Sequence, residues 1–229
     1  MKKLLTGFTM VFIAMVTLMP LAKAQKNPFI GTVVYDVTVI GDVPDQAKSM
    51  MPTEMTMKVS PDKMITVIHS SMMDIKNVFD APAQVSNTLM DMMGQKFNIK
   101  NTAADLADQK KKAGLTMTVK PTTETKTIAG YNCKKAIMTV KSNQSADQTF
   151  DVYFTDGFDI SKFNFALTLP EVDGLPLEFT MAQGPFSLKM TARSVKKENI
   201  AASEFVIPTD YKQVTTEQLQ TMFGGGGQQ

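Results

Sequence analysis

The segment FIGTVVYDVTVIG, residues 29–41, decides the fold class, because its apolar side chains recur at every second position. The residues that would share one face of an extended strand are Val33, Tyr35, Val37 and Val39. A period of two is typical of a β-strand that has one buried face and one face toward solvent. The segment therefore predicts an amphipathic strand rather than a helix.

Apolar alternation bounded by turn residues recurs along most of the chain. The segments that show it are 53–59, 63–69, 87–101, 115–120, 124–130, 133–141, 148–156, 175–181 and 186–197. We predict roughly ten strands, with 87–101 forming a hairpin that turns near Gly94. Strands at this spacing are typical of antiparallel sheets.

Two short segments carry the start and stop signals of helices. Thr102 is followed three residues later by Asp105, which is a variant of the capping box. Thr215 and Gln218 repeat the same spacing near the C-terminus. The predicted helices cover 102–114 and 215–224. The expected fold class is therefore α+β but mainly β, with an antiparallel sheet and a few short helices.

The first 24 residues have the pattern of a secretory signal peptide. Lys2 and Lys3 precede an apolar run that ends at Leu21, and the small residues of AKA (22–24) suit cleavage before Gln25. A transmembrane anchor fits this pattern less well, and no later segment is long and apolar enough to cross a bilayer. We expect an exported chain that has no membrane-spanning segment once the signal is removed.

Three segments are expected along the chain. These are a signal peptide at 1–24, a single β-rich domain at 25–223 and a flexible glycine-rich tail at 224–229. No internal repeat and no linker divides the middle segment.

Charge argues against a nucleic-acid partner. The whole chain has 24 basic and 22 acidic residues. The signal segment holds three of the lysines and no acid, so the mature chain keeps 21 basic and 22 acidic residues. A nearly neutral protein lacks the basic surface that binds phosphate backbones. We therefore expect no nucleic-acid partner.

The chain has one cysteine and one histidine, Cys133 and His69. A single thiol cannot form an internal disulfide, and a buried free cysteine packs as a small apolar residue. We expect Cys133 to be buried, with a disulfide-linked dimer as the alternative. A hydrolase that uses Cys133 with His69, or Ser60 in an S-x-x-K spacing, is the enzymatic alternative; we expect no enzyme activity.

Methionine is abundant, with 19 residues in the chain, and is concentrated in the first half. Its flexible thioether fills irregular cores and lines adaptable apolar binding surfaces. Thioether sulfur also binds Cu(I), so His69, Met72 and Met73 form a weak alternative metal site in a chain otherwise expected to hold no metal and no cofactor.

Four segments together resemble an exported bacterial family named domain of unknown function 4412. They are TKTIAGYNCKKAIMTV (125–140), VDGLPLEF (172–179), SEFVIPTDYKQVTTEQLQTMF (203–223) and TLMDMMGQKFNIKN (88–101). The resemblance covers most of the mature chain but transfers no functional residue. It implies a fold similar to LolA-like lipoprotein carriers, in which a curved antiparallel sheet forms a half-barrel with helices over its concave face. It also implies a periplasmic location, whereas the signal segment alone implies only secretion.

Such a half-barrel would hold a lipid or another apolar ligand against its inner face. The lining residues predicted from strand alternation are Val37, Met55, Met57, Ile65, Met90 and Met117. The alternative is an envelope scaffold that has a packed core, binds an unidentified protein partner and has no small-molecule ligand.

Overall fold

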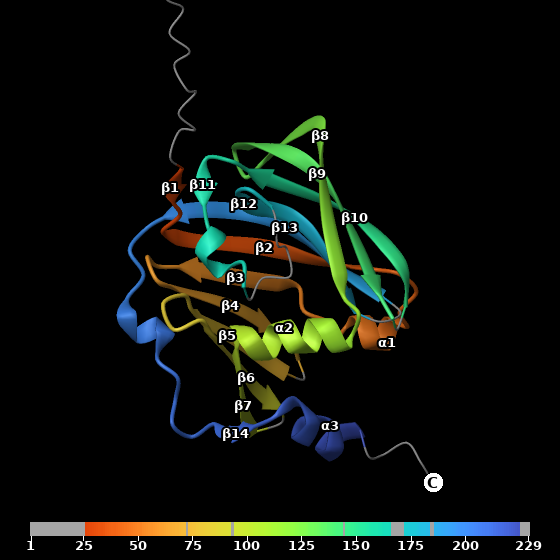
Figure 1. Cartoon of the computed structure of the whole chain (residues 1–229), viewed down its shortest axis with the longest axis vertical. Coiled ribbons are helices and arrows are strands. Elements are labelled where there is room, and N and C mark those ends of the chain that lie inside the picture. Colours follow the sequence, from red (N-terminus) through yellow and green to blue (C-terminus); the bar gives the residue numbers. More distant parts are fainter. Residues whose placement is uncertain are drawn as a thin grey trace, which may run out of the picture.

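A curved, open antiparallel sheet in the shape of a half-barrel dominates the molecule, and short helices lie against it (Figure 1). The computed structural model describes residues 26–71, 73–92, 94–143, 145–165, 172–183 and 186–224. The expected signal peptide lies outside these residues, as does the expected tail apart from Gly224.

The strands of the main sheet form one continuous series among the described residues. Their order across the sheet is β14-β7-β6-β5-β4-β3-β2-β13-β12-β10-β9-β8. Their bounds are β2 Gly31–Ile40, β3 Glu54–Val59, β4 Lys63–His69, β5 Met73–Asp80, β6 Val85–Met92, β7 Gln95–Thr102, β8 Thr116–Ile128, β9 Tyr131–Ser142, β10 Ser145–Thr155, β12 Leu175–Gln183, β13 Phe186–Lys197 and β14 Lys212–Val214.

Neighbouring strands of this sheet are antiparallel, except that β14 pairs with β7 in parallel. A separate parallel pair joins β1 (Asn27–Pro28) to β11 (Phe158–Asp159). The β8–β9 turn has Ala129 at φ 49° and Gly130 at φ 81°. Two successive positive φ values match the right-handed twist of a hairpin, and glycine adopts this conformation without steric cost.

The helices are short. They are α1 Asp45–Lys48, η1 Ser161–Phe163, α2 Ala103–Lys112, η2 Ala202–Phe205 and α3 Thr216–Gly224. The predicted capping box of α2 is confirmed, because the Asp105 amide donates to Thr102 Oγ1 and the Thr102 amide donates to the Asp105 carboxylate. The same exchange between Thr215 and Gln218 starts α3. Within the described residues, no helix is both long and apolar enough to cross a membrane.

The concave face of the sheet carries the main core. Val33 and Tyr35 of β2 and Met55 and Met57 of β3 are almost fully buried there. The hydroxyl of Tyr35 donates to the carbonyl oxygen of Pro176 at 2.8 Å, so its polar end has a partner inside the core. The alternation predicted for 29–41 therefore corresponds to the inner face of a central strand.

A second, smaller core lies on the convex face. Ile65, Val78 and Leu89 are buried there beneath the C-terminal segment that contains Phe205 and Tyr211. Ile65 pairs with Lys58, whereas its neighbours Met64 and Thr66 pair with Val59 and Met57. Residues that pair directly share a face, so Ile65 points away from Met57 and from the concave side. The prediction of Ile65 as a residue of the concave lining is wrong.

Two further predictions of local structure need correction. The predicted strands 115–120 and 124–130 form one strand, β8, which has an irregularity between Pro121 and Thr125. Strand β5 was not predicted at all, although it lies between β4 and β6 in the sheet. It carries Lys76 and Asn77 side by side, which interrupts the apolar pattern.

Candidate functional site

An apolar groove of about 650 Å³ opens on the concave face of the sheet. Its methionines are Met50, Met51, Met73, Met92 and Met181, and its other apolar residues include Ile68, Ile75 and Leu188. Ser70 and Gln95 are its polar lining residues among those described. Its size lies within the range of about 300–1,000 Å³ that is typical of small-molecule sites.

The loop between β2 and β3 forms one wall of the groove. Ala47 of α1 and the following Met50, Met51 and Pro52 line it. Asp45 lies in the first turn of α1 and Lys48 in the last, an arrangement that suits the helix dipole. Met50 is 39% exposed, so an apolar side chain lies where the groove meets solvent.

A smaller pocket of about 280 Å³ adjoins the groove beneath α2. Ile68 and Met181 line both spaces, so the two recesses lie side by side. Leu106 of α2 lines the smaller pocket together with the inner side chains of the sheet. Figure 1 shows α2 crossing the strands on this side of the sheet.

The smaller pocket contains a polar ladder, which we define as Thr66, Asn77 and Thr88 on the neighbouring strands β4, β5 and β6. The Asn77 amide donates to Thr66 Oγ1 at 3.1 Å. The Thr88 hydroxyl donates to Asn77 Oδ1 at 2.8 Å. Because Asn77 pairs directly with both threonines, the three side chains form a hydrogen-bonded row across the sheet.

Neither the groove nor the smaller pocket has an Asp, Glu, Lys or Arg in its lining among the described residues. Burying an unpaired charge in such a space is costly, whereas apolar surface is favourably removed from water there. Both recesses are therefore suited to an uncharged, largely apolar ligand.

The predicted lining residues other than Ile65 occupy different parts of the concave side. Met55 and Met57 line the smaller pocket. Val37 and Met117 pack against the main core, and Met90 packs with Phe97, Ile99 and Val214 near α3. Whether any of them contacts a ligand stays a prediction.

Sequence reasoning missed most of the groove. Met73 and Ile75 of the groove and Asn77 of the smaller pocket were not predicted as lining residues, because no strand was predicted at 73–80. The segment MDIKNVFD at 73–80 alternates apolar and polar residues over 73–76 and is followed by the turn-forming APAQ at 81–84, so a partial signal for the strand was present.

The alternative copper site is not assembled by the described residues. His69 pairs with Asp74 across β4 and β5, and its Nδ1 lies 2.9 Å from the Asp74 carboxylate. Met73 is adjacent to Asp74 in the strand and lines the groove on the other face. His69 and Met73 therefore point in opposite directions, and Met72 lies outside the described residues.

Cys133 is completely buried and makes no disulfide, which confirms the prediction of a hidden thiol. It lies on β9, whereas His69 is exposed on β4, and five strands separate β9 from β4 in the sheet. The two residues do not form a nucleophile–base pair.

The side chain of Ser60 forms hydrogen bonds with the backbone of Lys63 within a turn, which is a structural role.

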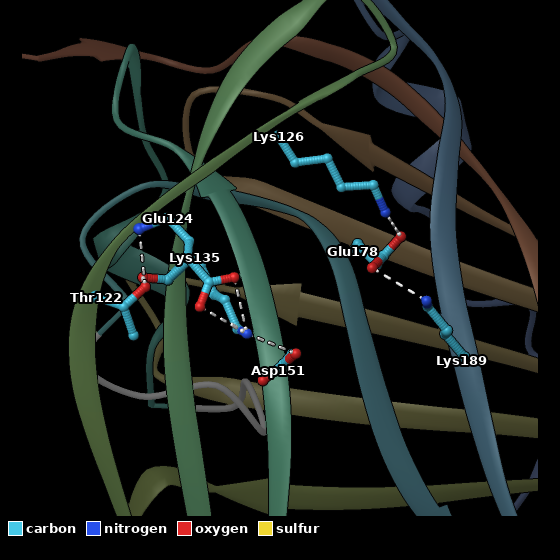
Figure 2. Close-up of polar contacts among 7 residues, drawn as sticks. All are labelled: Thr122, Glu124, Lys126, Lys135, Asp151, Glu178 and Lys189. Atoms are coloured by element: carbon cyan, nitrogen blue, oxygen red, sulfur yellow. Dashed lines mark hydrogen bonds and ion pairs between the residues drawn. The ribbon is translucent and has the colours of Figure 1, made fainter.

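A buried carboxylate, Glu178, lies on β12 on the face opposite Met181 of the groove, and Figure 2 shows it with its lysine partners. Glu178 is 5% exposed and forms ion pairs with Lys126 at 2.8 Å and Lys189 at 3.1 Å. It also accepts a hydrogen bond from Thr191. Its partners are Lys189 and Thr191 on the neighbouring strand β13 and Lys126 on the edge strand β8, so we assign this cluster to stability rather than to catalysis.

No family model matches the sequence, and no curated protein matches it. The resemblance to domain of unknown function 4412 therefore stays a prediction. The solved structures that match this chain include two of low sequence identity. LprF from Mycobacterium bovis is 11% identical, with 80% of this chain and 90% of that chain covered and a TM-score of 0.32.

The second structure is a β-barrel-like protein of domain of unknown function DUF1849 from Brucella abortus. It is 9% identical, with 76% of this chain and 100% of that chain covered and a TM-score of 0.36. At these levels neither structure identifies a function for this chain.

Proposed function

We propose that this protein is an exported, non-enzymatic binder of a lipid or another apolar ligand, which it holds in the methionine-lined groove on the concave face. The observation that carries the proposal is the groove itself, with about 650 Å³ lined almost entirely by apolar side chains. Burial of a hydrocarbon chain there removes apolar surface from water at roughly 25 cal/mol per Å².

The chemistry of the lining supports binding rather than catalysis. Methionine side chains are flexible and polarizable, so they adapt to chains of different shape. Neither recess presents an acid, a base or an activated nucleophile among its described residues. We further propose that the protein acts in the periplasm, as the family resemblance implies.

The test uses protein purified without detergent from the exported fraction, followed by native mass spectrometry and solvent extraction. Wild-type protein is compared with Met73→Glu, which places a charge inside the groove, and with Met222→Glu. Met222 is 47% exposed on α3 and does not line the groove, so it provides the same substitution elsewhere.

We expect an extractable apolar adduct on wild-type protein and on Met222→Glu, and none on Met73→Glu. Uptake of the neutral fluorescent probe N-phenyl-1-naphthylamine should follow the same order. Equal adduct and equal probe uptake in all three proteins would contradict the proposal, as would the absence of both from all three.

A further inference from the structure

The polar ladder has hydrogen-bonding capacity that its own three members do not use. An asparagine side chain can form about four hydrogen bonds. Asn77 uses one amide hydrogen toward Thr66 and one oxygen lone pair toward Thr88. Within the described part of the chain, the second amide hydrogen of Asn77 and the hydroxyl hydrogen of Thr66 meet no acceptor.

These hydrogen bonds run in one direction, because Thr88 donates to Asn77 and Asn77 donates to Thr66. Hydrogen bonds in such a row polarise one another. Thr66 Oγ1 accepts from Asn77, which leaves its hydroxyl hydrogen free to donate to an oxygen acceptor. Ser86 and Asn101 add further polar groups to the same pocket.

The pocket's composition sets the charge of the group that fits there. A carboxylate or phosphate would need a cationic partner, and the described lining offers neither lysine nor arginine. An alcohol, an ester or an amide presents an acceptor oxygen and needs no counter-ion. The volume of about 280 Å³ holds a head of several non-hydrogen atoms, since a water molecule occupies about 30 Å³.

The apolar groove lies beside this polar pocket, and Ile68 and Met181 line both spaces. It reaches solvent beside Met50. A ligand that fills both spaces has a polar end beneath α2 and an apolar chain that follows the methionines outward.

We infer that the protein selects a single-chain amphiphile with a small uncharged head, bound with its head at the ladder and its chain in the groove. This inference rests on the proposed function and adds the class and orientation of the ligand. Thr66 and Asn77 are then specificity-determining residues, because they donate to the head.

The test compares 1-dodecanol with dodecane, which has the same chain without the hydroxyl. Each compound competes with N-phenyl-1-naphthylamine for the purified protein. We expect dodecanol to bind wild-type protein about tenfold more tightly than dodecane, as two additional hydrogen bonds allow. This comparison requires no variant, so it remains informative if a variant fails to fold.

The ladder variant combines Thr66→Val, Asn77→Leu and Thr88→Val. These substitutions replace both partners of each hydrogen bond with apolar side chains of similar shape. No polar group is then left without a partner, so the change in the free energy of unfolding is expected to be close to zero. The matched control combines Asn87→Leu and Asn98→Leu. Asn98 donates to Asn87 at 3.3 Å on the opposite face of the neighbouring strands β6 and β7.

We expect the ladder variant to lose the preference for dodecanol while it keeps its affinity for dodecane, and the control to behave like wild type. Equal binding of the two compounds to wild type would overturn the inference and leave the proposed function standing. A preference that survives in the ladder variant would also overturn it. If neither compound displaces the probe from any folded protein, the proposed function itself fails.

Discussion

Glu178 on β12 and Lys126 on β8 form an ion pair of 2.8 Å, although β9 and β10 lie between their strands in the sheet. The pair therefore ties the edge strand β8 to an interior strand. Lys189 on the neighbouring strand β13 holds the second carboxylate oxygen at 3.1 Å. Figure 2 shows Glu178 between the two lysines.

The first prediction concerns Glu178→Gln, which removes this charge but keeps the shape. We expect a loss of about 1–2 kcal/mol in the free energy of unfolding at pH 7, below the cost of breaking a wholly buried pair because both lysines are partly exposed. The control is Glu124→Gln, whose carboxylate pairs with Lys135 but is 62% exposed. That change should cost less than about 1 kcal/mol. Urea denaturation measures the free energy of unfolding of both variants. Equal losses in the two variants would contradict the assignment of the Glu178 cluster to stability.

The pH dependence of stability follows from the same carboxylate. Burial alone would raise the pKa of Glu178, but the hydrogen bonds and charges of Lys126 and Lys189 outweigh it and lower the pKa from 4.5. Its stabilising contribution is therefore complete above the unfolded pKa of about 4.3 and is lost as the pH falls through the folded value. Wild-type protein should lose more stability than Glu178→Gln between pH 6 and pH 3. If the free energy of unfolding of wild type and of Glu178→Gln falls equally with pH, Glu178 is not the group responsible.

Cys133 should resist thiol reagents in the folded protein. Its side chain is fully buried, and burial raises the pKa of its thiol above the ordinary value of 9.0, which leaves little reactive thiolate at neutral pH. Ellman's reagent should react slowly with native protein and rapidly in denaturant. Rapid reaction without denaturant, or a disulfide-linked dimer on a non-reducing gel, would contradict this placement.

Ile65 supports the convex-face core and should not affect ligand binding. Ile65→Ala is expected to reduce the free energy of unfolding by about 2–4 kcal/mol, because it opens a cavity beneath Phe205. The affinity of the folded variant for N-phenyl-1-naphthylamine should remain that of wild type. If the variant binds the probe more weakly while its free energy of unfolding is unchanged, Ile65 is part of the binding site.

Thr102 caps the helix that covers the smaller pocket. Thr102→Ala should cost about 1 kcal/mol, because it removes the acceptor of the Asp105 amide at the first turn of α2. Thr123→Ala changes an exposed threonine of β8 and serves as the control. Thermal unfolding monitored by circular dichroism compares the two variants. Equal unfolding midpoints for Thr102→Ala and Thr123→Ala would show that the Thr102 cap does not stabilise α2.

Local sequence signals predicted much of this fold. Alternation in 29–41 identified a central strand, and the spacing of Thr102 and Asp105 identified the start of α2, because both features depend on residues close in sequence. The two faces of β4 could not be assigned in this way. Apolar residues occur on both, since the segment around Phe205 covers the convex face from far along the chain.

The groove was less predictable than the strands. Alternation indicates which residues share a face but not how much space remains above that face. The ladder depends on the register that brings Asn77 of β5 between Thr66 and Thr88, and register becomes known only once three strands are aligned. An apolar concave face was therefore expected, whereas its volume and its polar end required the structure.

The most direct test of ligand binding in the groove is methyl NMR of protein labelled with ¹³C at the methionine methyl groups, titrated with 1-dodecanol. We expect the signals of Met50, Met51, Met73, Met92 and Met181 to shift together as the groove fills. Those of buried Met64 and exposed Met222 should stay in place. If saturating dodecanol leaves the five groove signals unchanged, or shifts the Met222 signal alone, the ligand does not bind in the groove.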